Sequence, residues 1–336
     1  MSGSTWQRMG MHITAALALF VFAFAQAAPP APVEGGFTLV VVPDTQNYTW
    51  KRPELYALQA GWIAANVQRY NIAHILHVGD ITQHNNVEEW TAARRAQSLY
   101  SDLVPAAYAA GNHDFGPNGN TETRGSLFAD YISFADYRRR PGFGGVYDRE
   151  PDRTENSYHL FEGGGRQWLI LVLEFAPRDD VVRWANDIVT RHPRRWVILL
   201  THAYLAADGT RFDGKKQSHG PAFYPLADSP DGSNDGEALW QKLVSRHANF
   251  ALVISGHVGV AAYLESKGVN GNSVHQLVVD YQDIENGGNA WLRLLQFLPD
   301  GKTVRVRDYT PLLDQTSKSR ECAFEFVLDP ASFDGQ

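Results

Sequence analysis

Short apolar runs alternate with stretches of helical periodicity over most of the chain. The runs end in Gly, Pro, Asp or Thr, which predicts buried strands, and the stretches between them place apolar residues on one helical face. The predicted strands cover residues 37–42, 75–78, 104–109, 157–161, 167–175, 196–200 and 252–255. The predicted helices cover residues 54–69, 87–103, 179–191 and 237–247. Strands that alternate with helices indicate an α/β architecture.

The rest of the pattern indicates one domain over residues 37–330, followed by a short tail, 331–336. Three glycines at 163–165 separate two predicted strands and favour a hairpin. Residues 260–328 read mostly as strands and turns, and no internal repeat divides the chain. Two polar segments, 115–156 and 205–236, are expected to cover a site.

The N-terminus has the pattern of an export signal. Arg8 precedes an apolar run, Ile13 to Phe24, which ends at the small-residue motif Ala25-Gln26-Ala27. That run is shorter than the roughly 20 residues that span a bilayer. We therefore expect a signal peptide, 1–27, a linker, 28–36, and a periplasmic or extracellular mature protein. The alternative is that the segment is kept as an anchor; no stable membrane partner is otherwise expected.

Composition narrows the classes of function. The chain has 30 Lys and Arg against 37 Asp and Glu, a formal charge of −7. This balance argues against non-specific nucleic-acid binding, which depends on many basic contacts to phosphates. The one cysteine, Cys322, supplies no disulfide, so stability must come from the core and from any bound metal.

Five polar residues follow predicted buried strands, and they carry the candidate chemistry. In α/β sheets, ligands gather outside the carboxyl ends of the strands. Carboxylate, amide and imidazole side chains are donors for divalent cations. Together they predict a metal site. The five residues are Asp44, Asp80, Asn112, His202 and His257.

Other hydrolytic and nucleotide-binding motifs do not fit. A serine-hydrolase elbow, Gly-x-Ser-x-Gly, does not occur in the sequence. Residues 209–215 resemble a phosphate-binding loop, but Lys216 stands where that motif has Ser or Thr. We interpret the match as coincidence.

The motifs, in their order, resemble those of the calcineurin-like metallophosphoesterases. That pattern runs Asp-x-His, Gly-Asp, Gly-Asn-His-Asp/Glu, His and Gly-His-x-His. The corresponding segments here are Asp44-Thr45-Gln46, Gly79-Asp80, Gly111-Asn112-His113-Asp114, His202 and Gly256-His257. The resemblance covers residues 38 to about 260. More loosely, the chain looks like the secreted bacterial branch in which Asp-x-Gln replaces Asp-x-His.

This resemblance implies a four-layer α/β/β/α sandwich with two metal ions bridged by a carboxylate and a hydroxide. Asp80 would be the bridge, and Asp44 and Gln46 would hold the first metal. His113 would be the general acid, with Asp114 orienting its ring. The second metal would be completed by Asn112, His202 and His257.

Two departures from the pattern both affect the first metal. Gln46 replaces a histidine, and Gly259 stands where the last histidine of Gly-His-x-His would be. The remaining oxygen donors favour Mn, Fe or Mg at the first site, whereas Mn, Fe or Zn suits the second. We therefore expect a tight second metal and a labile first one.

The sequence leaves open which further residues contact the substrate or the metal. His84 and His219 are candidates for substrate binding or for an extra metal ligand, and residues 280–282 with His275 are weaker candidates. Purple acid phosphatases carry Gly-Asp-x-x-Tyr, whereas this chain has Gln83 in place of the tyrosine. A tyrosinate-bound iron is not expected.

The resulting hypothesis is metal-dependent hydrolysis of a phosphate monoester or diester by a metal-activated hydroxide. The substrate would be a small molecule or an exported phosphate ester. The alternative is a phosphate-ligand-binding protein on a degenerate scaffold, suggested by Gly259. His113 and Asp114 favour the enzyme, because a binding protein has no need of a leaving-group acid.

Overall fold

The computed structural model describes residues 28–328 of the chain. The predicted signal peptide, 1–27, and the predicted tail, 331–336, lie outside the described residues, as do the last two residues of the predicted domain. Within the described part, no helix is both long and apolar enough to cross a membrane.

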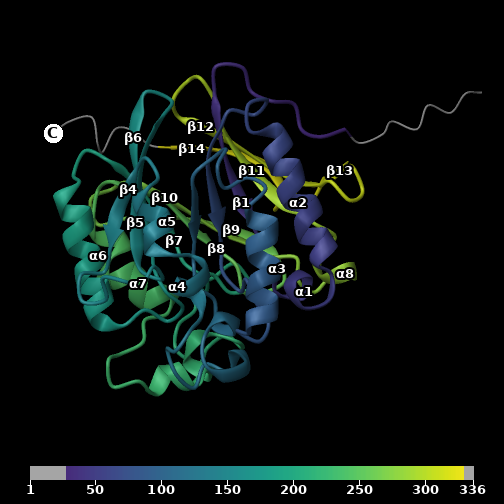
Figure 1. Ribbon diagram of the computed structural model, residues 1–336. Helices are drawn as coiled ribbons and strands as arrows, with labels where there is room; N and C mark the ends of the chain where they lie inside the picture. Colours follow the sequence, from purple (N-terminus) through teal and green to yellow (C-terminus); the bar gives the residue numbers. More distant parts are fainter. Residues whose placement is uncertain (1–27, 329–336) are drawn as a thin grey trace, which may run out of the picture.

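Two seven-stranded sheets form the centre of the molecule (Figure 1). The first has the order β13-β12-β11-β1-β2-β3, with β14 also paired to β12, and the second has the order β4-β5-β6-β7-β8-β10-β9. The strands of the first sheet are β1 (Phe37–Val42), β2 (Ile72–His77), β3 (Ala106–Tyr108), β11 (Leu292–Phe297), β12 (Thr303–Thr310), β13 (Gln315–Thr316) and β14 (Ala323–Val327). Those of the second are β4 (Phe143–Val146), β5 (Ser157–Gly163), β6 (Arg166–Val172), β7 (Trp196–Leu200), β8 (Phe250–Ser255), β9 (Ala261–Lys267) and β10 (Ser273–Val279).

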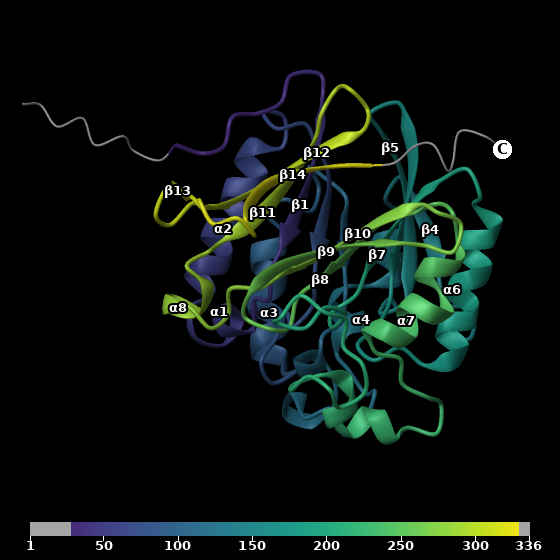
Figure 2. The same ribbon diagram turned by 180° about the vertical axis from the view of Figure 1, so that it is seen from behind.

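Helices cover the outer faces of both sheets. The helices are α1 (Gln46–Lys51), α2 (Pro53–Asn66), α3 (Val87–Gln97), α4 (Phe128–Tyr131), α5 (Phe134–Arg138), α6 (Asp179–Arg191), α7 (Gly236–Lys242) and α8 (Glu285–Gly288). Figures 1 and 2 show α1 to α3 on one side of the molecule and α6 and α7 on the other. Short 3₁₀ turns lie in the loops at Asn112–Asp114, Pro117–Gly119, Pro221–Phe223, Pro225–Asp228 and Val244–Arg246.

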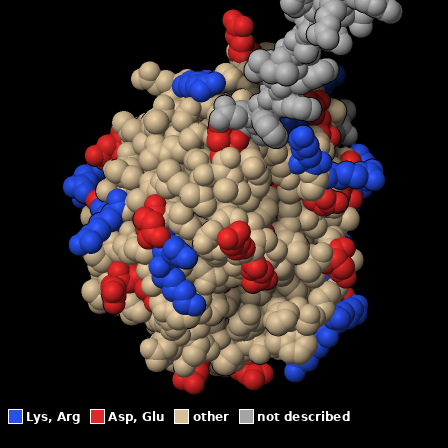
Figure 3. Space-filling view, turned by 90° about the vertical axis from the view of Figure 1, so that its right-hand side faces the viewer, with Lys and Arg blue, Asp and Glu red and all other residues tan. Residues whose placement is uncertain are grey.

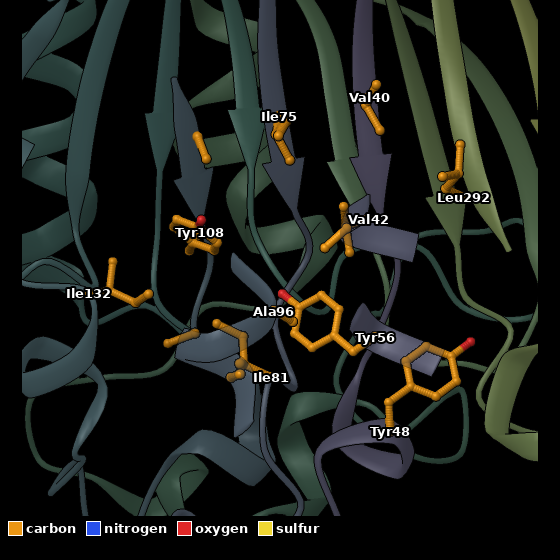
Figure 4. Packing of buried hydrophobic residues seen from close by; sticks show 14 of the residues in the cluster. Val40, Val42, Tyr48, Tyr56, Ile75, Ile81, Ala96, Tyr108, Ile132 and Leu292 are labelled. Atoms are coloured by element: carbon orange, nitrogen blue, oxygen red, sulfur yellow. The ribbon is translucent and has the colours of Figure 1, made fainter. Parts of the chain in front are cut away.

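The alternation of side chains along β1 explains the layers. Leu39 and Val41 face the second sheet, in a buried cluster that also contains Ile170 of β6. Val40 and Val42 face the opposite way and pack with α2 and α3 (Figure 4). Both faces of β1 are therefore apolar, as expected for a parallel strand covered on both sides.

The second sheet is also buried on both faces. Its residues Leu169 and Leu171 pack against Val181 and Ile188 of α6, and its other face meets the first sheet. Three apolar layers separate four layers of secondary structure. The fold is the four-layer α/β/β/α sandwich that the resemblance implied.

Parallel pairing brings the functional ends of the strands together. In the first sheet β2 is parallel to β1 and β3. In the second, β7 is parallel to β6 and β8, and β8 to β10. The carboxyl ends of the parallel strands in each sheet therefore lie at one edge, from which the site is built.

Several predicted boundaries agree with the structure, and others shift. The strands at 37–42 and 196–200 and the helix at 179–191 have the predicted bounds. The helix predicted at 87–103 ends at Gln97, because residues 98–103 form turns. The segment 28–36 does not hang free: Pro30 is buried, and its carbonyl accepts a hydrogen bond of 2.7 Å from the Tyr70 hydroxyl.

The described surface is mixed in charge. On the face shown in Figure 3, Lys and Arg side chains are interspersed with Asp and Glu. This distribution agrees with the composition, which is mildly acidic.

Candidate metal centre and active site

The predicted ligands of the second metal converge from both sheets. His202 Nε2 lies 3.3 Å from Asp80 Oδ2, 3.1 Å from Asn112 Oδ1 and 3.1 Å from His257 Nδ1. Asp80, His202 and His257 can each direct one donor atom so that all three lie within 4.8 Å of one another. These groups are buried, and their spacing suits one shared cation.

Two glycines, Gly79 before Asp80 and Gly111 opposite it, allow these side chains to come so close together. Asp80 and Gly79 both have positive φ, 45° and 106°. A Cβ on Gly111 would lie 2.1 Å from Asp80 Oδ1, and one on Gly79 would lie 2.8 Å from His202 Nδ1. Only glycine leaves room for the carboxylate and the imidazole, which gives the Gly-Asp and Gly-Asn motifs a steric reason.

Asp44 and Gln46 lie beside this group, at the end of β1. The backbone N–H of His257 donates to Asp44 Oδ2 at 3.2 Å, and Gln46 Nε2 donates to Asp80 Oδ2 at 3.2 Å. The other amide atom of Gln46, Oε1, is buried and has no hydrogen-bond partner. An unpartnered buried oxygen beside two carboxylates is a donor suited to a cation.

His113 lies at the wall of the site. Its backbone N–H donates to Asp80 Oδ1 at 2.8 Å, and its ring Nδ1 lies 3.0 Å from the carbonyl oxygen of Gln83. A proton on Nδ1 directed at that carbonyl leaves Nε2 for the cavity. Gln83 therefore orients the ring. From the sequence alone, this residue indicated only that a tyrosinate-bound iron is not expected.

Asp114, expected to orient the ring, has hydrogen-bond partners in the neighbouring loops. Its carboxylate accepts hydrogen bonds from the backbone N–H groups of Ile81, Thr82 and Gly111, at 2.9–3.1 Å, and from the Thr82 hydroxyl at 2.9 Å. Asp114 is fully buried. It fixes the loops that carry Asp80 and Asn112, since its partners belong to both.

The two candidate histidines differ in position. His84 Nδ1 pairs with Glu89 Oε1 at 2.7 Å, and its ring packs against Trp50. His219 lines the cavity, and its backbone carbonyl lies 2.6 Å from His257 Nε2. His219 therefore contacts a predicted ligand through its main chain, which its residue type could not reveal.

Asp280 and Gln282 belong to the site more closely than their sequence pattern indicated. Asp280 is fully buried after β10, and its carboxylate accepts from the backbone N–H of Gly259 at 2.6 Å and of Gln282 at 2.9 Å. The Gln282 side chain contacts Gln46. The available signal was the same as for the other residues, a polar side chain just after a buried strand.

Crowded carboxylates give the site its electrostatics. Burial, followed by the charges of Asp280 and Asp80, raises the pKa of Asp44 well above its usual range. Burial raises the pKa of Asp280 and of Asp114 to about 6, with Asp80 adding to both shifts. Such a concentration of negative charge is relieved by a cation.

The pKa values of Asp80 and His257 shift in the opposite sense. Burial alone would raise the pKa of Asp80, but His202 and His113 outweigh it and hold that pKa far below the usual range. Burial and then His202 lower the pKa of His257 to about 3. A charged carboxylate beside a neutral imidazole is the protonation state that metal binding requires.

An open cavity of about 460 Å³ adjoins these groups. Gln46, Asp80, Asn112, His113, His257 and Gln282 form its floor, and residues of the 206–224 loop form its wall. The segment 205–236 thus contributes to the cavity as expected. Among the described residues lining it, none belongs to 115–156, which instead places Phe128, Ile132 and Tyr137 in the core beside α3.

Comparison with known families agrees with the motif order. A sequence model of the calcineurin-like phosphoesterases matches residues 37–261. The chain is also 28% identical over 288 residues to YvnB of Bacillus subtilis (strain 168), an uncharacterized protein. That match covers 83% of this chain and 20% of YvnB, so the chain spans about a fifth of the length of that relative.

Solved structures share the fold at low sequence identity. A purple acid phosphatase from yellow lupin (Lupinus luteus) seeds aligns with a TM-score of 0.55 and 14% identity, over 92% of this chain and 57% of that one. A dimetal phosphatase from Danio rerio aligns with a TM-score of 0.52 and 12% identity, over 88% and 99%. These similarities concern the arrangement of sheets and helices.

Proposed function

Because the chain belongs to the calcineurin-like phosphoesterase family, we propose that it hydrolyses the phosphate esters of small molecules with bound divalent cations. The observation that carries the proposal is the convergence of Asp80, Asn112, His202 and His257 within hydrogen-bonding distance at the floor of a cavity. These residues come from both sheets, so the site exists only in the folded sandwich.

The donors present suit two cations of different affinity. Asp80, Asn112, His202 and His257 would hold the second cation, with two imidazoles that suit Mn, Fe or Zn. Asp44, Asp80 and Gln46 would hold the first through oxygen atoms, a set that favours Mn, Fe or Mg. When bound, such cations polarise phosphoryl oxygens and make water a nucleophile near neutral pH.

His113 is proposed as the general acid. It lines the cavity, and its Nδ1 is directed at the Gln83 carbonyl. A doubly protonated ring would donate Nδ1–H to that carbonyl and hold its Nε2 proton toward the ester. Transfer of that proton to the leaving oxygen would stabilise the departing alcohol. The Asp80 carboxylate, bound to the His113 backbone N–H, keeps this ring beside the cation site.

The cavity supports a small substrate. A volume of about 460 Å³ lies within the range of small-molecule sites. Tyr224 in the wall could lie against a sugar or base, and Lys216 could approach a second phosphate oxygen. The N-terminal sequence supports export, and an exported enzyme of this kind would act on esters outside the cytoplasm.

The test is hydrolysis of chromogenic phosphate monoesters and diesters by the purified mature chain with added Mn²⁺. We expect turnover that is lost with a chelator and restored by Mn²⁺. If every ester remains intact while inorganic phosphate still binds the Mn²⁺-loaded protein, the chain is a binding protein instead.

A further inference from the structure

Gly259 leaves the first cation short of a ligand, and the structure contains a side chain that can supply it. We propose that Gln282, through its amide oxygen, completes an oxygen-ligated first cation site with Asp44, Gln46 and Asp80. This inference rests on the proposed function only in assuming that the site binds cations.

The loop after β10 holds Gln282 near Gly259. The Asp280 carboxylate accepts both the Gly259 and the Gln282 backbone N–H groups, so the two residues are fixed to one anchor. Gln282 Nε2 also donates to the carbonyl oxygen of His257 at 3.3 Å. Its amide oxygen is thereby directed away from this loop, toward Gln46.

The amides of Gln46 and Gln282 face each other beside Asp80. Gln46 Nε2 donates both to Gln282 Oε1 and to Asp80 Oδ2, the latter at 3.2 Å. Two acceptors from distant parts of the chain, one after β2 and one after β10, therefore converge on one nitrogen. The two acceptor oxygens surround a position at which a cation could replace the N–H donors.

The orientation of the Gln46 amide supports this substitution. With Nε2 directed at the two acceptors, Gln46 Oε1 is buried without a partner, and Gln46 is only 3% exposed. A half-turn of the amide would bring Oε1 next to Gln282 Oε1 and Asp80 Oδ2. Three oxygens at that point repel one another unless a cation lies between them, and Mn²⁺ and Mg²⁺ favour such ligands.

Asp283, the neighbouring acidic residue, has a different place. Its carboxylate fills the space where a Gly259 side chain would start, 2.1 Å from that Cβ position, and the residue is exposed. Gln282 contacts Gln46, which in turn contacts Asp80. Asp283 instead occupies the position of a Gly259 side chain, at the edge of the same cavity. The loop therefore both occupies the space of the missing histidine and provides a replacement oxygen.

The test measures Mn²⁺ binding to the metal-free mature protein, without substrate, by electron paramagnetic resonance of free Mn²⁺. We expect two classes of site in the native chain. Gln282→Ala should weaken the weaker class at least about 10-fold and leave the tighter class unchanged. Gln282→Glu, of similar size, should tighten the weaker class. The control is Gln167→Ala, an exposed amide on β6 that contacts Glu162.

Three results would overturn the inference: a single class of site in the native chain, unchanged binding in Gln282→Ala, or equal weakening of both classes. Gln282→Glu keeps the test valid if Gln282→Ala does not fold. A failure of the proposed function can be distinguished from a failure of this inference. A native chain that hydrolyses no ester, but whose weaker site responds to Gln282, would refute hydrolysis and leave the ligand assignment standing.

Discussion

Asp80 and His113 are neighbours in the site with separable roles. Asp80 contacts His202 and Gln46 through Oδ2, so its removal would take a donor from both proposed cation positions. The His113 ring instead contacts Gln83. We expect Asp80→Ala to abolish hydrolysis and most bound metal. His113→Ala should lower turnover by about 10²–10⁴-fold with the metal retained.

Metal content by mass spectrometry, measured with turnover on the same samples, checks this division. Gln167→Ala again serves as the control for handling and folding. Equal loss of metal in Asp80→Ala and His113→Ala would contradict the separate roles.

Asp114 is expected to act on stability. Its replacement by alanine leaves four donors without an acceptor in a fully buried position. The free energy of unfolding should fall by about 3 kcal/mol or more. Urea unfolding followed by tryptophan fluorescence measures this. A stability within about 0.5 kcal/mol of the native chain, with turnover reduced as in His113→Ala, would instead support Asp114 as the partner of the ring.

At the scale of elements, continuous apolar runs predicted the strands that carry the site. The run at 37–42 is a strand with both faces buried, and Asp44 follows it as expected. An apolar run followed by a polar residue also marks β10 and Asp280. The prediction was less clear there, because His275 and Gln276 interrupt the apolar run, although both are buried in the structure.

The loops were not predictable in the same way. The orientation of His113 depends on the carbonyl of Gln83, and that of His257 involves the carbonyl of His219. Every residue carries a backbone carbonyl, so no residue type marks these contacts. The α/β class and the five strand-end residues follow from the strand patterns, and the four-layer sandwich follows from the family resemblance. The supporting contacts depend on loop conformation.

The loop after β8 also determines whether a missing ligand can be restored. Gly259 has φ of 65°, and a Cβ there would meet Asp283. Gly259→His should therefore destabilise the protein by at least about 1 kcal/mol and should not tighten the weaker Mn²⁺ site. Thermal unfolding and Mn²⁺ titration test this. Tighter binding without loss of stability would show that the loop accommodates the histidine.

At the scale of the molecule, the two sheets concentrate buried carboxylates at one edge. Burial raises the pKa of Asp280 and Asp114 to about 6, above the ordinary 3.8. The folded state then binds more protons than the unfolded state, so these groups reduce stability as pH rises toward about 6. A bound cation offsets that loss by stabilising the ionised carboxylates.

The increase in Tm produced by Mn²⁺ should therefore grow as pH rises through about 6. His257 does not reverse this trend, because its pKa of about 3 leaves it neutral over that range. Melting curves with and without Mn²⁺ between about pH 5 and pH 7 measure the effect. An increase that is constant with pH, or larger at low pH, would contradict it.

The central claim is that strand ends from two sheets enclose a cation, and anomalous X-ray diffraction from Mn²⁺-soaked crystals tests it most directly. We predict an anomalous peak bounded by Asp80, Asn112, His202 and His257, with a weaker neighbouring peak beside Asp44 and Gln46. No peak among these residues at saturating Mn²⁺, in a protein that still hydrolyses phosphate esters, would contradict the account.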